Sequence, residues 1–281
     1  MTLPPRSTGG RRRTNVNLII GIAIIGSMAL MTLVSFVYTP HDVNAMHRDH
    51  RFEGPSARFL LGTDNFGRDI FSRLMHGGRT AFFVGTVAVG IGIVVGTMIG
   101  GVAGYLGSWV DELFMRVMDG LLAFPGLIMA LMVIAIAGPG TLNTAFAIGV
   151  MSVPGISRIA RSGFLQYRNI EFVQSARTIG VRPVVIMAKH ILPNVATSLV
   201  IAGSVAFAGA ILSEAGLSFL GLGVQLPDPS WGRMLRDAQG HFMRTPWFTL
   251  GPGLAITLMV LGFYSLSNGI RDAIDVREAH G

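Results

Sequence analysis

Long apolar runs constrain the possible folds of this chain more than any other feature. Residues 17–38 and 81–106 are two such runs, and each reaches the roughly 20 residues that a helix needs to cross a bilayer. Charged residues make up 13% of the chain, whereas soluble domains carry about 25%. The runs also lack the strict alternation of strands in a membrane barrel. We therefore predict an all-α, polytopic membrane protein with six transmembrane helices.

The basic residues indicate how the chain is threaded through the membrane. Arg11, Arg12 and Arg13 precede the first apolar run, and positive charge at that place favours a cytoplasmic amino terminus. The run is too long for the apolar part of a signal peptide, which is the alternative interpretation. The predicted segments are a cytoplasmic tail (1–16), the first transmembrane helix (17–38), an extracytoplasmic segment (39–79), a core with five further transmembrane helices (80–270) and a cytoplasmic tail (271–281).

Charge and residue types exclude several classes of function. The net charge is +7 and the pI is about 10.9, values often found in nucleic-acid-binding proteins. Here the arginines are scattered among the predicted loops, as expected beside membrane spans, so we predict no nucleic-acid partner. The absence of cysteine excludes disulfides and thiol chemistry. Lys189 is the only lysine and follows no glycine-rich loop, so the chain has no Walker motif for binding ATP.

The amphipathic segment 169–194 interrupts the apolar runs. Asn169 can cap a short helix that has Glu171 in its first turn. Gly180 is placed to end this helix, and Pro183 can begin the next one. Four apolar residues recur at helical spacing, namely Phe172, Val173, Ala176 and Ile179. A basic helix of this kind lies either flat on the bilayer or against another protein.

This segment resembles a motif of a known family. Gln174, Ser175 and Ala176, followed by Gly180 and then by Leu192-Pro193, are similar to the EAA motif of ABC-transporter permease subunits. Gln174 replaces the family's usual Glu, and Ser175 replaces its first Ala. In that family the loop is a coupling helix, which docks in a groove of the ATPase subunit. The resemblance implies that helix 169–180 is the docking element, with contact residues Glu171, Phe172, Gln174, Ser175, Ala176 and Gly180.

Two further blocks resemble the dipeptide, oligopeptide and nickel branch of these permeases. The first is LLGTDNFGRDIFSR at 60–73, and the second is ILSEAGLSFLGLGVQLPDPSWGRML at 211–235. The second block departs from the family pattern at one proline, which is Leu226 here. The resemblance implies a type I ABC importer permease fold and a permease core at 80–270, similar to the C-type subunits of dipeptide permeases.

The same resemblance implies a set of partners. A permease subunit of this family has no ATPase site of its own and no cofactor, because ATP and Mg are bound by two partner ATPase subunits. It forms a heterodimer with a homologous second permease and receives solute from an extracytoplasmic substrate-binding protein. The spans contact membrane lipid. The implied location is the cytoplasmic membrane of a bacterium or archaeon, with both termini in the cytoplasm.

The solute implied by the resemblance is a di- or oligopeptide. Nickel, metal–opine complexes and glutathione are carried by the same branch and remain alternatives. A secondary transporter or channel is the alternative from another class, and it would require inverted repeats and several charges inside the membrane. Glu214 is nearly the only such charge. We interpret it either as a residue of the translocation path or gate, or as a carboxyl group bonded to neighbouring helix ends.

Other local patterns predict packing. Four glycines at intervals of four residues share one helix face and would let a second helix approach closely: Gly92, Gly96, Gly100 and Gly104. Asp69 can cap a helix, and Pro125 is expected to kink the third span. His41, His47 and His50 could bind a metal ion, but nothing in their spacing fixes a geometry, so we interpret them as solvated loop residues.

Overall fold

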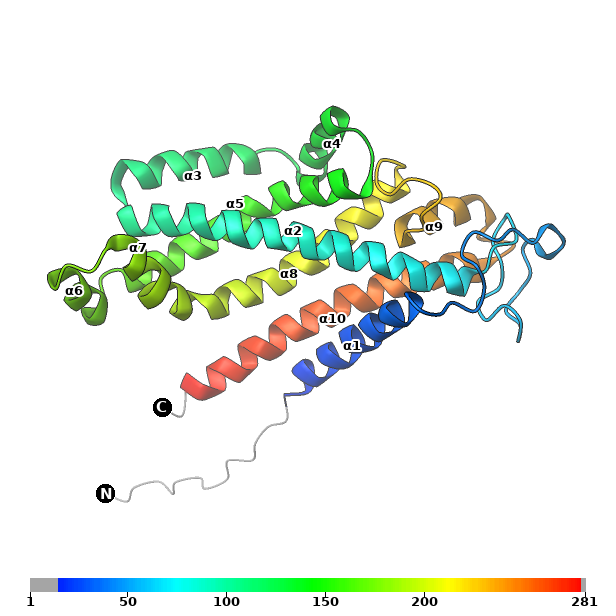
Figure 1. The fold of residues 1–281 in the computed structure, drawn as a ribbon, viewed down its shortest axis with the longest axis horizontal. Helices are drawn as coiled ribbons and strands as arrows, with labels where there is room; N and C mark the ends of the chain where they lie inside the picture. The colour runs from blue at the N-terminus through cyan, green and yellow to red at the C-terminus, as the bar shows by residue number, and fades with distance from the viewer. Residues whose placement is uncertain (1–14, 279–281) are drawn as a thin grey trace, which may run out of the picture.

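The computed structural model describes residues 15–278, and its regular elements are helices (Figure 1). The described residues contain no strand beyond an isolated bridge between Thr63 and Asp69. The predicted all-α class is thus confirmed. The helices are α1 (Val16–Ser35), α2 (Ile70–Leu106), α3 (Ser108–Leu122), α4 (Gly126–Ala137), α5 (Thr141–Tyr167), α6 (Glu171–Thr178), α7 (Pro183–Val185), a π-helix (Ile186–Ile191), α8 (Leu192–Phe219), α9 (Trp231–Ala238) and α10 (Pro246–Glu278), with 3₁₀ turns at Arg48–His50 and Gln239–His241.

The membrane spans correspond to the long helices of this set. Four are long and apolar enough to cross a bilayer by themselves: α1, α2, the continuous stretch Pro183–Phe219 that includes α8, and α10. The pair α3 and α4 meets the same criterion only when taken together. Helix α5 has 27 residues and is less apolar. Five of the six predicted spans therefore have a counterpart that meets this criterion: α1, α2, the α3–α4 pair, α8 and α10. α5 lies at the position of the fourth predicted span and does not meet it.

The third predicted span differs from the expected single kinked helix. It consists of α3 and α4, which meet at a bend of 89°. Pro125 is the residue before α4, with a φ of −53°. A proline has no N–H group to continue the hydrogen-bond ladder of α3, and it disfavours helical geometry at Phe124. The proline therefore separates two helices instead of bending one.

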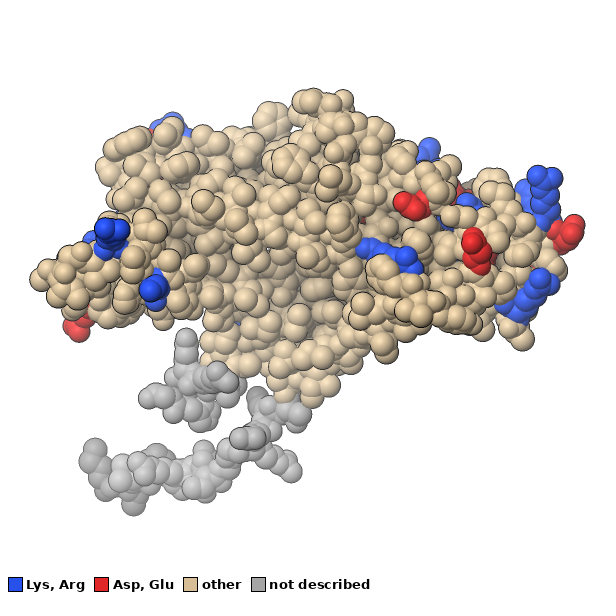
Figure 2. Space-filling model, in the orientation of Figure 1, with Lys and Arg blue, Asp and Glu red and all other residues tan. Residues whose placement is uncertain are grey.

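The helices form an elongated bundle whose two ends carry different elements (Figure 1). α6 and α7 lie at one end, and the last turns of α10 point toward the same end. α9 and the segment between α1 and α2 lie at the other end, which we call the α9 end. Charged side chains gather toward the two ends and leave an uncharged belt between them (Figure 2). This distribution is the one expected for a protein that crosses a bilayer along its long axis.

The four spaced glycines of α2 face α5, which confirms their predicted role in packing. A Cβ atom at Gly96 would lie 3.0 Å from Cβ of Ile156, and one at Gly100 would overlap the main-chain carbonyl of Ser157. α2 begins at Ile70, well before the apolar run, because the Asp69 carboxylate accepts a 2.9 Å hydrogen bond from the Ser72 amide. Asp69 is therefore the predicted N-cap.

Candidate functional site

Helix α6, the predicted coupling helix, lies at the extreme end of the bundle (Figure 1). It begins at Glu171, and the residue before it is Ile170 in an extended conformation. The prediction that Asn169 caps this helix is wrong. The Asn169 carbonyl instead accepts a 2.8 Å hydrogen bond from Gln174 Nε2. Glu171 does occupy the first turn, where its negative charge interacts favourably with the helix dipole.

Two residues attach α6 to the bundle. Val173 and Ala176 are 0% and 6% exposed, and they belong to a buried apolar cluster between the helices. Other members of this cluster are Tyr105 of α2, Phe164 of α5, and Ile186 and Ile191 of the π-helix. Burial of one short face holds α6 in a fixed position relative to α2, α5 and the π-helix.

The remaining surface of α6 is exposed. Phe172 and Ile179 are 42% and 79% exposed, so the predicted apolar stripe is divided between a buried half and a free half. Of the six predicted contact residues, Ala176 is buried and the other five are exposed: Glu171, Phe172, Gln174, Ser175 and Gly180. An exposed apolar and polar surface on an anchored helix is suited to binding another protein.

The end of α6 follows the predicted pattern. Gly180 has a φ of +80°, a conformation that side chains with a Cβ rarely adopt. The Val181 amide then donates a 3.0 Å hydrogen bond to the Ala176 carbonyl, which closes the last turn. Pro183 is the first residue of α7, as expected from its fixed φ. These features set the direction in which the chain returns toward the membrane.

Ion pairs connect α3 to α5, a contact that the sequence analysis missed. Arg161 donates two hydrogen bonds to Asp111, one of them of 2.5 Å from its terminal nitrogen. Arg158 donates a 2.6 Å hydrogen bond to Asp119. The partners are 50 and 39 residues apart, so no local spacing could reveal them. The paired charges are expected to hold α3 parallel to the bundle.

A hollow of about 630 Å³ lies between α5 and α8 and is open on one side. Small and hydroxyl-bearing residues line much of it, including Ser152, Gly155, Ser198, Gly209 and Ser213. Arg271 of α10 also contributes to its wall. The hollow therefore offers a mixed surface of hydroxyl groups, one cation and aliphatic side chains.

Glu214 lies inside the subunit. Its side chain is almost completely buried, and it is not among the residues that line the hollow, although its neighbour Ser213 is. The Ser218 hydroxyl donates a 2.7 Å hydrogen bond to Glu214 Oε1 and accepts one of 3.1 Å from the Val224 amide. This geometry favours the second interpretation, in which the carboxyl group joins a helix end to the following loop.

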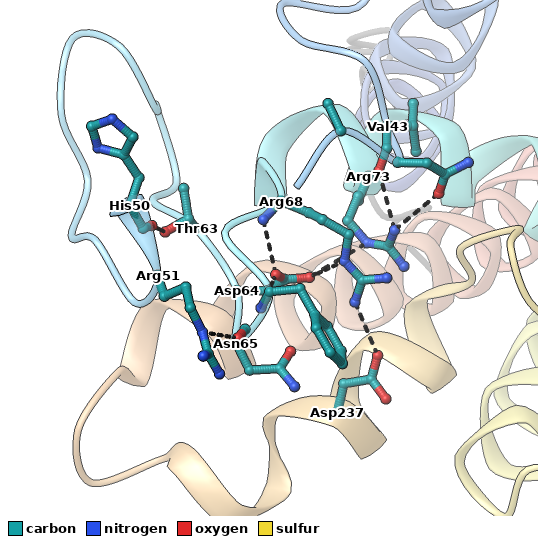
Figure 3. A network of polar contacts seen from close by, with 12 residues as sticks. Val43, His50, Arg51, Thr63, Asp64, Asn65, Arg68, Arg73 and Asp237 are labelled. Carbon is teal, nitrogen blue, oxygen red and sulfur yellow. Dashed lines mark hydrogen bonds and ion pairs between the residues drawn. The ribbon is translucent and has the colours of Figure 1, made fainter. Parts of the chain in front are cut away.

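A buried polar cluster lies at the α9 end (Figure 3). Asp64 Oδ2 accepts a 2.6 Å hydrogen bond from Arg68 Nε, and Arg73 Nε lies 3.9 Å away from the same oxygen. The other end of the Arg68 guanidinium lies 3.5 Å from Asp237 of α9. Asp64, Arg68 and Arg73, which all belong to block 60–73, are each less than 6% exposed. The cluster therefore ties the outer segment to α9.

Trp231 provides a second link between the same regions. Its Nε1 donates a 2.9 Å hydrogen bond to the Leu74 carbonyl. A Cβ atom at Gly77 would lie only 2.8 Å from Cδ1 of the Trp231 ring, so the glycine leaves room for the indole. Block 60–73 and block 211–235 are far apart in the sequence but lie next to each other in the fold. The contacts between these two regions join residues that are more than 150 positions apart, so only the folded structure reveals them.

The loop histidines pack around a buried ring. The ring centroids of His41, His47 and His50 lie 4.8, 5.9 and 5.7 Å from that of Phe59, which is completely buried. His50 Nδ1 also lies 2.6 Å from a carboxylate oxygen of Glu53. Within residues 15–278 no group of three potential ligands is arranged to hold a metal ion. The histidines are more enclosed than the solvated loop residues that we expected.

Known proteins resemble this chain over most of its length. Residues 70–280 match the family described as "Binding-protein-dependent transport system inner membrane component". The chain belongs to this family. It is 39% identical to the dipeptide transport system permease protein DppC of Alkalihalophilus pseudofirmus, over 97% of this chain and 90% of the relative. It is 38% identical to the glutathione transport system permease protein GsiD of Pectobacterium atrosepticum, over 90% and 86%. It is also 38% identical to the di/tripeptide transport system permease protein DppC of Pseudomonas aeruginosa, over 89% and 87%.

The fold has a counterpart among solved structures. A chain of the MetNI methionine ABC transporter in an inward-facing conformation superimposes with a TM-score of 0.54. The alignment covers 71% of this chain and 93% of that chain, at 16% sequence identity. The protein therefore has the predicted ABC importer permease fold. It is a permease of a binding-protein-dependent transport system in the inner membrane.

Proposed function

We propose that this chain is the permease subunit of an ATP-driven importer of short peptides, and that α6 transmits the action of partner ATPases. The observation that carries this proposal is the exposed face of α6, which is anchored by Val173 and Ala176 at the end of the bundle. A chain without a Walker motif needs an external source of energy. ATP and Mg would be bound by those partner subunits.

The solute path lies along the hollow between α5 and α8, facing a homologous second permease. The support is that the hollow is open on one side and carries hydroxyl groups and Arg271, whereas a closed subunit core would be apolar. Ser152, Ser198 and Ser213 are the residues that we assign to the path. Glu214 is assigned to the support of the loop after α8, because the Ser218 hydroxyl that donates to it also accepts a hydrogen bond from the Val224 amide in that loop.

A peptide or peptide-like solute is favoured by the names of the relatives. Two of them are described as dipeptide or di/tripeptide permeases, and one as a glutathione permease. Glutathione is itself a small peptide. Nickel uptake, the alternative within the same branch, has no support among these relatives. A secondary carrier or channel is disfavoured because the family depends on a binding protein.

The first experiment tests the coupling surface. The chain is co-purified with its second permease and two ATPase subunits, and ATP hydrolysis is measured with binding protein loaded with dipeptides, tripeptides, glutathione or Ni²⁺. Phe172→Ala combined with Gln174→Ala is expected to release the ATPase subunits on size-exclusion chromatography. Met243→Ala, at a residue 94% exposed in the segment between α9 and α10, is the matched control and should retain them. Retention by the double variant would contradict the assignment of α6.

A second experiment tests the orientation of the chain. Because the protein has no cysteine, single cysteines can be introduced without background labelling. Ser175→Cys in α6 is expected to be protected from a membrane-impermeant maleimide in intact cells, and Met243→Cys is expected to react. Labelling of Ser175→Cys from outside would reverse the proposed topology and remove α6 from the reach of ATPases.

A further inference from the structure

A second groove lies between α2 and the stretch from α7 to α8. It has a volume of about 650 Å³, and Thr97 is the only polar residue among those that line it. Val94 and Met98 form part of the α2 wall, and Val184 and Val200 form part of the opposite wall. All four of these side chains are exposed. The groove is thus an apolar surface without a partner in this chain, and it differs in chemistry from the hollow between α5 and α8.

The length of the groove corresponds to one leaflet of a bilayer. Its α2 wall runs from Ile93 to Val102. At about 1.5 Å per helical residue this wall is roughly 14 Å long, and half of a hydrocarbon core of about 30 Å is roughly 15 Å. From Val102 the helix continues only to Leu106, toward the end where α6 and α7 lie (Figure 1). The groove therefore occupies the leaflet on the α6 side.

Positive charge surrounds the α6 end of this groove. Arg182 precedes the lining residue Val184 by two positions, and Lys189 directly follows the lining residue Ala188. Arg177 lies over the ring of Tyr105, 4.7 Å from its centroid, near the end of the α2 wall. These three cations are exposed, and none has a carboxylate within 4.0 Å among the described residues. Figure 2 shows basic side chains in this part of the molecule.

We propose that the groove is a binding site for an anionic phospholipid. One acyl chain lies along the apolar walls, and the phosphate group lies near Arg182 and Lys189. An apolar channel of one leaflet's depth with unpaired cations at its interfacial end matches both parts of such a lipid. A second permease would instead be expected at the hollow between α5 and α8, which also carries serine hydroxyls and Arg271. The inference rests on the proposed function only in naming the leaflet as the cytoplasmic one.

The site can be tested on the full-length chain in detergent. The protein is incubated with phosphatidylglycerol and with phosphatidylcholine of identical acyl chains, and retained lipid is counted by native mass spectrometry. The native chain is expected to retain phosphatidylglycerol preferentially. Arg182→Gln combined with Lys189→Gln should reduce this preference about 25-fold, since each basic residue near a headgroup contributes about fivefold. Arg116→Gln on α3, at an exposed arginine paired with Glu112, should leave it unchanged.

Filling the groove separates lipid binding from simple anion binding. Ala196→Trp and, as a second variant, Val200→Trp place a large ring in the groove while all the basic residues remain. Each is expected to abolish retention of both lipids at this site, and glycerol phosphate should not compete with phosphatidylglycerol. The proposal would be overturned if the Arg182 and Lys189 double variant preferred phosphatidylglycerol as strongly as the native chain does. Undiminished lipid retention in both tryptophan variants would overturn it as well. Because no ATPase takes part, this result is independent of the coupling experiment.

Discussion

The indole Nε1 of Trp231 donates a 2.9 Å hydrogen bond to the main-chain carbonyl of Leu74, a residue 157 positions earlier in the chain. The bond fixes α9 against the first turns of α2. Trp231 is 1% exposed, so its ring and its N–H group are both fully enclosed. The two sequence blocks that most resemble the family are therefore joined at one end of the bundle.

Trp231→Phe is expected to destabilise the protein. The variant loses the donor and leaves a gap beside Gly77, which together should lower the free energy of unfolding by about 1–3 kcal/mol. The measurement is unfolding of the purified protein in mixed micelles of increasing denaturant content. Trp109→Phe, at a tryptophan 70% exposed on α3, is the control and should change little. Equal stability of the two variants would show that the hydrogen bond from Trp231 to Leu74 does not stabilise the fold.

Asp64→Asn is expected to be among the most damaging single substitutions at the α9 end. It would leave the buried cations Arg68 and Arg73 without their shared carboxylate. Removing one partner of a buried ion pair lowers the free energy of unfolding by about 3–5 kcal/mol. The matched control is Glu112→Gln, which breaks an exposed pair with Arg116 and should cost less than about 1 kcal/mol. Yield in the membrane and thermal unfolding in detergent report the difference.

Gly100→Ala should separate α2 from α5. The new methyl group would meet the main-chain carbonyl of Ser157, which cannot move without shifting the helix, so we expect a loss of about 1–3 kcal/mol in stability. Gly90→Ala lies on the same helix with no neighbouring atom within 4 Å of its Cβ. That control should be neutral or slightly stabilising because alanine favours the helix. Thermal unfolding of the two variants side by side gives the comparison.

Gly180→Ala should impair coupling more than folding. The φ of +80° costs a residue with a Cβ about 1–2 kcal/mol, and the space around Gly180 is otherwise free. We expect normal amounts of protein in the membrane but weaker stimulation of ATP hydrolysis by loaded binding protein. Gly240→Ala, which has free space and lies near α9, is the control. Full stimulation in Gly180→Ala would mean that the exit from α6 tolerates a change of direction.

Glu214→Gln distinguishes the two interpretations of this carboxyl group. A glutamine oxygen can still accept the hydrogen bond from Ser218, so a supporting role predicts nearly unchanged solute uptake. A role in the gate that depends on charge predicts loss of uptake in the same variant. Glu214→Ala should destabilise the protein by about 1–3 kcal/mol in either case, since it leaves the buried Ser218 hydroxyl without its acceptor. Uptake of labelled peptide and thermal unfolding together decide between them.

Local chemistry determined much of this protein from its sequence alone. Apolar runs of sufficient length require helices in lipid, because no other backbone arrangement in these runs satisfies its own hydrogen bonds there. Asp69, Gly180 and Pro183 act within one turn of their own positions, and the structure places each of them at the predicted helix boundary. The α2 glycines share a face by periodicity, whatever lies opposite.

Tertiary structure decided what lies opposite each face. The α6 stripe is uniformly apolar in sequence, yet Val173 is buried and Ile179 is exposed because only one side meets α2, α5 and the π-helix. The Arg161–Asp111 pair and the Arg68–Asp237 pair join residues far apart in the chain. Periodicity and capping are local forces that fix where helices form. Which surfaces become buried, paired or free depends on contacts between distant segments, and these exist only once the bundle has assembled.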